Sequence, residues 1–132
     1  MYIGGILNML FVIFHLSFWT LFDWQQGLVS LSSDNRAIIQ VLNIHTAYVL
    51  FVFAILSFVF ANEMISVNLG RFVALAIAIF WGLRAVNQAL FWNASSAESW
   101  MIIFVCLVMA LLYLIPGLNF HQYKKAVLHK SV

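Results

Sequence analysis

Charge is scarce in this sequence. It holds six Lys or Arg and four Asp or Glu among 132 residues, which is 8%, whereas an ordinary globular domain has about a quarter charged residues. So few charges cannot cover the surface of a soluble 15.1 kDa domain. This absence excludes a soluble enzyme, a nucleic-acid-binding protein and a disordered linker.

Cysteine and proline are almost absent as well. The single Cys106 excludes an internal disulfide framework, a CxxC redox pair and a cysteine zinc site. Pro116 is the one proline, and we expect the last helix to end there, or to kink and continue toward Tyr123. There is no internal repeat or low-complexity tract, so residues 1–132 are predicted to form a single domain.

Long apolar runs are abundant. Hydrophobic residues make up 65% of the chain and the mean hydropathy is +1.03. Four runs approach the length of about 20 residues that a helix needs to cross the hydrocarbon core, and short links join them. The sequence therefore predicts an all-α, integral membrane four-helix bundle of up-down-up-down topology, with spans at 2–22, 37–61, 71–92 and 100–115.

The basic residues predict an orientation. Four spans place both termini on the side of the second link. That side has four basic residues, Arg71, Lys124, Lys125 and Lys130, and the other side has Arg36 alone. By the positive-inside rule both termini are cytoplasmic. The first run lacks a basic n-region and a small-residue cleavage motif, so we interpret it as a retained span.

Polar side chains gather at one depth of the predicted spans. At about 1.5 Å per residue, His15, His45 and Arg84 lie roughly 10–12 Å inside the outer ends of their helices. Gln40, Asn43, Asn87 and Gln88 lie nearer that surface. The candidate ligand-binding layer in the outer half is therefore His15, His45, Arg84, Asn43, Asn87 and Gln88. Asn43 and His45 point about 160° apart at 100° per residue, and the sequence does not say which of them meets the first helix.

Arg84 is the residue least expected inside a span. A buried arginine there is costly and usually faces a partner or water. No predicted span contains Asp or Glu, and the nearest carboxylates, Asp23, Asp34 and Glu98, lie at the outer rim. Two interpretations stay open. Arg84 is a structural residue that reaches toward the surface or is held by amides and Asp23, or it contacts an anionic ligand or head group.

The two histidines also allow more than one interpretation. Facing histidines in a helical bundle can be axial ligands of haem b, with Arg84 at a propionate. Histidine in a membrane can instead form hydrogen bonds between helices, or relay protons. His121 and His129 are too dispersed to indicate a metal site.

Several short strings resemble a known group of proteins. They are Phe14-His15-Leu16-Ser17-Phe18-Trp19, Leu21-Phe22-Asp23-Trp24, Asn35-Arg36-Ala37-Ile38, Gln40-Val41-Leu42-Asn43-Ile44, and Phe80-Trp81 followed by Arg84 and Gln88. Together they resemble an uncharacterised family of small bacterial four-span integral membrane proteins of about this length, over roughly the first ninety residues. The resemblance implies a location in the bacterial inner membrane, and it implies no activity and no catalytic residues.

Three functions follow as hypotheses. The first is a non-enzymatic protein that binds a lipid, a small ligand or a membrane partner through the outer polar layer. The second is a small transporter or transporter subunit, although the first span lacks an embedded acidic residue for proton coupling. The third is a haem- or quinone-binding redox subunit. No carboxylate pair, nucleophile–base pair or metal cluster is visible inside the bundle, which argues against an enzyme. The expected partners are membrane lipids, with a second copy or another membrane protein left open.

Overall fold

The computed structural model describes residues 1–92 and 96–118, and most of these residues are helical. Helices account for 87% of them and none forms a strand. The elements are α1 (Tyr2–Leu16), α2 (Phe18–Leu21), α3 (Trp24–Gly27), α4 (Ser33–Val59), α5 (Glu63–Ser66), α6 (Asn68–Phe91) and α7 (Ala97–Leu118).

Three of these helices have the length and composition of membrane spans. They are α4, α6 and α7, with 27, 24 and 22 residues, whereas the apolar helix α1 has only 15. Each of the three exceeds the roughly 20 residues that crossing a membrane requires. These lengths support the prediction of a helical membrane protein. They do not confirm a span at 2–22, because α1 is too short.

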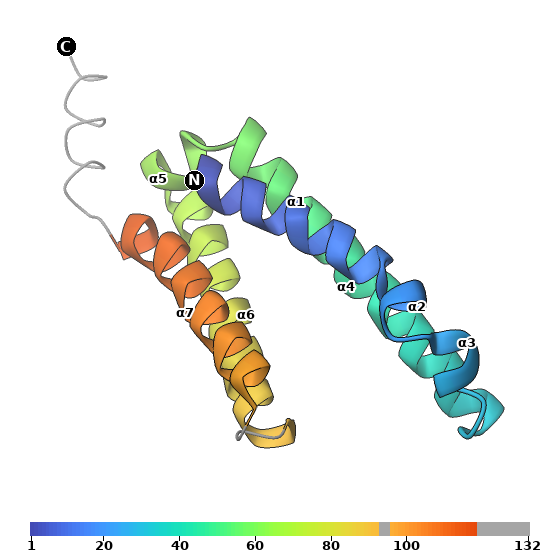
Figure 1. The fold of residues 1–132 in the computed structure, drawn as a ribbon. Helices are drawn as coiled ribbons and strands as arrows, with labels where there is room; N and C mark the ends of the chain where they lie inside the picture. Colours follow the sequence, from blue (N-terminus) through green and yellow to red (C-terminus); the bar gives the residue numbers. More distant parts are fainter. Residues whose placement is uncertain (93–95, 119–132) are drawn as a thin grey trace, which may run out of the picture.

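The long helices form two antiparallel hairpins. α1 packs along α4, and α6 packs along α7. Figure 1 shows the two hairpins as the arms of a V. They meet near the N-terminus and α5, which we call the closed end, and they diverge toward α3 and the start of α7, which we call the diverging end. The up-down-up-down order is as predicted, but the expected closed four-helix bundle is not confirmed.

The helix bounds differ from the predicted spans at several points. α4 begins four residues earlier than position 37, because the Ser32 hydroxyl accepts a bond from the Asn35 N–H at 3.3 Å and caps the helix. α7 starts at Ala97 and includes Pro116 as far as Leu118. Of the two alternatives for its end, the structure therefore excludes an end at Pro116. A continuation toward Tyr123, and the tail lysines, lie outside the described residues.

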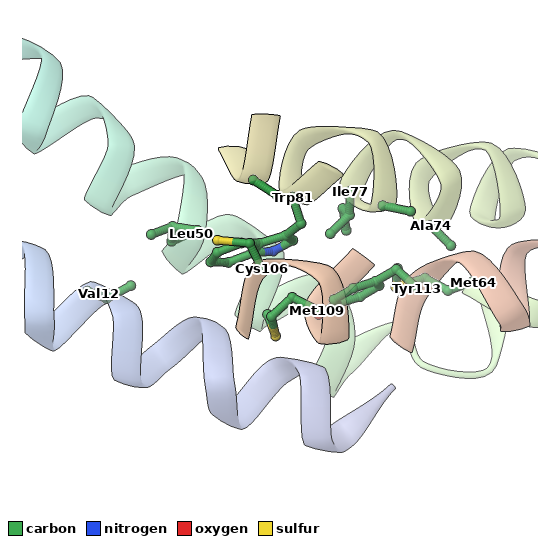
Figure 2. Close-up of a cluster of buried hydrophobic side chains, with 11 residues drawn as sticks. Val12, Leu50, Met64, Ala74, Ile77, Trp81, Cys106, Met109 and Tyr113 are labelled. Atoms are coloured by element: carbon green, nitrogen blue, oxygen red, sulfur yellow. The ribbon is translucent and has the colours of Figure 1, made fainter. Parts of the chain in front are cut away.

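The two hairpins share a hydrophobic core near the middle of the molecule. Trp81 of α6 is 2% exposed, and its ring centroid lies 4.8 Å from that of Phe11 on α1. Figure 2 shows Trp81 beside Leu50 of α4 and Cys106 of α7. One large indole therefore lies where all four long helices approach one another, and its burial contributes to holding the arms together.

A buried polar cluster joins the hairpins closer to the closed end. The Tyr113 hydroxyl on α7 accepts a bond from Asn8 Nδ2 of α1 at 2.7 Å and lies 2.6 Å from the Ser57 hydroxyl of α4. All three side chains are fully buried. Gly4 makes room for the phenol, because a Cβ at this position would lie 2.7 Å from the Tyr113 ring. Polar contacts of this kind stabilise helix association where water is excluded.

The closed end is completed by α5 and the start of α6. A Cβ at Gly70 would collide with the Glu63 backbone carbonyl, so only glycine permits this close approach. Arg71 is buried, and its Nε donates to the Gly117 carbonyl at 3.1 Å. That carbonyl belongs to the last turn of α7, where no helical N–H is left to satisfy it.

Candidate functional site

His15 and Asn43 form a two-point contact between α1 and α4. Asn43 Nδ2 donates to the His15 backbone carbonyl at 2.9 Å, and Asn43 Oδ1 lies 2.7 Å from His15 Nδ1. Because the amide nitrogen is committed to the carbonyl, the amide oxygen must accept, and His15 Nδ1 therefore carries the proton. In the neutral imidazole this leaves Nε2 with a lone pair, on the edge of the ring turned away from Asn43.

The same contact coincides with a break in the first helix. The predicted span 2–22 is divided at Ser17 into α1 and α2. The Asn43 amide occupies the His15 carbonyl, and the Ser17 hydroxyl donates to the Ile13 carbonyl at 2.8 Å. Side chains that enter the backbone hydrogen-bond ladder are a common cause of helix bends and interruptions.

Aromatic rings surround the His15 side chain. The imidazole stacks on Phe18 with centroids 4.6 Å apart, and Phe14 meets both rings edge-on. Phe18 in turn contacts Phe22 and Trp24 toward the diverging end. These contacts hold the half-buried imidazole in one orientation.

His45 does not join this group. It is exposed, and its Nδ1 bonds to the Val41 carbonyl of its own helix at 2.8 Å. Asn43, Ala47 and Leu50 mark the face of α4 that is turned to the rest of the molecule, and at 100° per residue His45 points to the opposite face. The two histidines therefore face different surroundings, and the described part of one chain does not place them as a pair of haem ligands.

Arg84 lies one helical turn beyond the contact between Phe11 and Trp81, toward the diverging end. It is half-buried on α6. Within residues 1–92 and 96–118, its guanidinium has no hydrogen bond and no salt bridge. Arg84 is thus a half-buried cation whose donors are unused by the described protein.

The residues on either side of Arg84 also have unused hydrogen-bonding atoms. Trp81 Nε1 is buried without an acceptor, and Gln88 Oε1 is buried without a donor. Gln88 Nε2 donates to the Ser99 hydroxyl at 3.2 Å, and reversing the amide would only exchange which of its two atoms is unpaired. Trp81, Arg84 and Gln88 follow one another at three- and four-residue spacing on one face of α6. We call them the Arg84 stripe.

Unpaired polar atoms are uncommon in protein interiors, and each costs roughly 1–3 kcal/mol. Trp81 and Gln88 each have one such atom, and the half-buried Arg84 lies between them on the same face of α6. Trp81 and Gln88 are buried, so the partly exposed guanidinium of Arg84 is the member of the stripe that a ligand can reach. Its chemistry suits a negatively charged ligand.

The other predicted members of the polar layer are peripheral. Asn87 is exposed, Gln40 is half-buried, and neither has a hydrogen bond to another described residue. The structure thus brings His15 and Asn43 together. It places Arg84 and Gln88 on one face of α6, and it leaves His45 and Asn87 apart. It also adds Trp81, which the sequence marked only as deeper than the other tryptophans.

The cluster of Asn8, Ser57 and Tyr113 was not predicted. Asn8 stood out in the sequence because it shares a stripe with Phe11 and His15, and a buried amide in a span requires a partner. Nothing in the sequence pointed to Tyr113 or Ser57 as that partner. In the described part of the chain no three His, Cys, Asp or Glu residues are close enough to hold a metal ion.

Comparisons with protein-family models, with curated proteins and with solved structures found no match to this chain.

Proposed function

We propose that this protein is a four-span membrane protein that binds the anionic head group of a membrane amphiphile at Arg84, in the half of the bilayer on the extracytoplasmic side. The location in a bacterial inner membrane and the cytoplasmic termini are parts of this proposal. The observation that supports it is the half-buried Arg84 guanidinium, which has no hydrogen bond or salt bridge to the described residues.

The chain itself offers no suitable anion. Its four acidic residues are Asp23, Asp34, Glu63 and Glu98, and they lie in links, in the short helix α5 or in first helical turns. An arginine within the membrane is stabilised by a counter-charge or by water. Because the protein supplies no carboxylate at that depth, an anion that pairs with Arg84 there has to come from outside the chain.

A second copy is a poorer source of this charge than a lipid. Each copy would bring another Arg84 and no spanning carboxylate, so the like charges would repel in a medium of low dielectric constant. An anionic lipid places its phosphate at the membrane surface and its chains against the apolar helices. Arginine binds phosphate through two parallel N–H bonds, which fixes orientation as well as charge.

The test measures lipid retention. The protein is reconstituted in nanodiscs of phosphatidylcholine with and without phosphatidylglycerol, and the lipids that remain bound are identified by native mass spectrometry. Wild type is expected to retain phosphatidylglycerol in preference to phosphatidylcholine. Arg84→Gln is expected to lose this preference.

Arg36→Gln is the matched control. It removes the same charge from α4, but the Arg36 guanidinium already donates to the Leu28 and Val29 carbonyls, at 3.1 and 3.3 Å. It should therefore retain the lipid as wild type does. If Arg84→Gln folds and still prefers phosphatidylglycerol, the proposal is wrong. A second result would also contradict the proposal: Arg84→Gln does not fold, and Arg84→Lys folds but does not prefer phosphatidylglycerol over phosphatidylcholine. Arg84 would then be a structural residue.

A further inference from the structure

α4 has an outward face that the rest of the described chain leaves exposed. Seven positions follow one another along it at alternating three- and four-residue spacing, which is the heptad spacing of paired helices. Six of them are exposed and Val52 is half-buried. We call them the α4 seam: Ile38, Val41, His45, Tyr48, Val52, Ile55 and Val59. The seam is β-branched and apolar except at its centre, where His45 and Tyr48 follow one another.

This polar pair lies deep in the part of α4 that crosses the membrane. α4 has 27 residues and is roughly 40 Å long at about 1.5 Å per residue, which exceeds a hydrocarbon core of roughly 30 Å. Wherever that core falls along α4, His45 and Tyr48 both lie at least about 7 Å inside it. Polar groups at this depth are costly when they face lipid chains, so the pair favours a protein partner over lipid.

The outward faces of the other two long helices have no such residues in their middle turns. The exposed positions there are all apolar: Ala76, Ile79, Leu83, Phe104, Leu107 and Leu111. This is the composition expected of a helix face that contacts lipid chains alone. The polar pair therefore distinguishes the α4 seam from an ordinary lipid-facing surface.

His45 and Tyr48 have complementary free groups. His45 Nδ1 lies 2.8 Å from the Val41 carbonyl, and because a carbonyl only accepts, Nδ1 carries the proton of the neutral ring. His45 Nε2 is thus an acceptor. Within residues 1–92 and 96–118, neither this atom nor the Tyr48 hydroxyl has a hydrogen bond. One chain therefore presents one free acceptor and one free donor on the same face.

We infer that the α4 seam is the interface with a second copy of this chain, in which two parallel α4 helices pair about a two-fold axis along the membrane normal. Each Tyr48 hydroxyl then donates to Nε2 of His45 of the partner subunit, and symmetry forms this bond twice. The two positions differ by about 4.5 Å along the helix. Side chains of helical residues lean toward the N-terminus, which brings the long tyrosine side chain toward the level of His45.

A second copy is the partner that suits this face best, because the face is complementary to itself. Donor and acceptor are equal in number, and a two-fold operation pairs each with the other. Polar contacts of this kind hold membrane helices together where apolar surface alone gives no preference over lipid. The inference uses the membrane location of α4 and does not depend on the lipid site at Arg84, which lies on α6.

The first experiment maps the interface by disulfide crosslinking in membranes. In a Cys106→Ala background, Val41→Cys and Ile55→Cys place a thiol on the α4 seam, and Leu83→Cys places one on α6. The three replaced side chains are 51%, 38% and 57% exposed. Oxidation should join the seam cysteines into a product with the mass of two chains and leave Leu83→Cys as a single chain. Equal crosslinking at all three positions would overturn the inference, and so would a product that contains a different protein.

The second experiment measures how tightly the copies pair. The dimer fraction is followed by energy transfer between donor- and acceptor-labelled chains in phosphatidylcholine vesicles over a range of protein-to-lipid ratios. His45→Phe and Tyr48→Phe should each weaken pairing about tenfold, because either change removes both symmetry-related bonds. The double variant should pair no more weakly than either single variant. A wild type that stays monomeric, or a His45→Phe that pairs as wild type does, would overturn the inference.

Thr46→Val is the matched control for pairing. It removes a hydroxyl from the position next to His45, but Thr46 Oγ1 already donates to the Leu42 carbonyl of its own helix at 2.8 Å, so its pairing should equal that of wild type. Tyr48→Phe should also unfold as wild type does in dilute detergent, where the copies are separated, because Tyr48 is exposed in the single chain. A less stable single chain would instead assign the hydroxyl to the fold and contradict its role in pairing.

Discussion

Asn43 of α4 holds His15 of α1 at two points, the imidazole Nδ1 at 2.7 Å and the backbone carbonyl at 2.9 Å. This amide thereby sets the tautomer of the imidazole. Its bond to the His15 carbonyl also lies where the first helix is interrupted, at Ser17. The same contact ties α1 to α4 within one arm of the V. A single residue thus contacts both the backbone and the side chain of His15.

The contact between Asn43 and His15 should be measurable as a coupling. In a double-mutant cycle of Asn43→Leu and His15→Phe, we expect an interaction free energy of about 1 kcal/mol, in the range found for hydrogen bonds between membrane helices. The measurement is unfolding by SDS titration from mild detergent. The cycle of Asn43→Leu with His45→Phe is the control and should show additivity, since His45 bonds only to its own helix among the described residues.

Removing the Tyr113 hydroxyl should weaken the junction between the hairpins. Tyr113→Phe leaves Asn8 and Ser57 buried without their shared partner, and we expect unfolding to become easier by about 1–2 kcal/mol. Tyr48→Phe removes the same hydroxyl from a side chain that is 64% exposed, and it should have no effect. Equal stabilities of the two variants in SDS titration would show that the cluster does not hold the arms together.

Two glycines offer a matched comparison of packing. A Cβ at Gly4 would lie 2.7 Å from the Tyr113 ring, whereas a Cβ at Gly82 would have nothing within 4 Å. Gly4→Ala must displace a hydrogen-bonded phenol, so we expect a loss of about 1–3 kcal/mol. Gly82→Ala should be neutral or slightly stabilising, because alanine favours the helix. The same thermal or SDS unfolding assay checks both, and a neutral Gly4→Ala would contradict the contact with Tyr113.

The proposed orientation can be tested by labelling. In a Cys106→Ala background, a cysteine replaces either Gln25 on α3 or Asn62 before α5, both of which are exposed. With cytoplasmic termini, a membrane-impermeant maleimide added to intact cells should label Gln25→Cys only. Asn62→Cys should react only after the cells are permeabilised. The reverse pattern would place the diverging end in the cytoplasm and would move the proposed lipid site to the other leaflet.

Hydropathy was enough to find the long helices, because span length and apolar composition are properties of the chain alone. It also led to Arg84, whose charge is conspicuous in any apolar run. The interruption at Ser17 was not predicted. It coincides with Asn43 bonded to the His15 carbonyl, a contact 28 residues away in sequence, and hydropathy contains no information on such contacts.

The candidate site was predicted in part for the same reason. Depth follows from counting residues, and the similar level of His15, His45 and Arg84 stays a prediction. Which face of α4 meets α1 depends on packing, and the structure selects Asn43 over His45. The partners of Asn8 depended on the register of α7 against α1, where Gly4 admits the Tyr113 ring. A single small residue decided that register, and the spacing of polar residues did not reveal it.

The cluster of Asn8, Ser57 and Tyr113 lies toward one end of the arms, so a rotation of one hairpin about this cluster would move its far tip most. From Tyr113 to Ala97 the α7 arm extends about 24 Å at 1.5 Å per residue. A rotation of about 10° at the pivot would therefore carry the far tip by roughly 4 Å. Small changes of packing around one phenol are in this way amplified into displacements large enough to follow with a pair of spin labels on α3 and the start of α7.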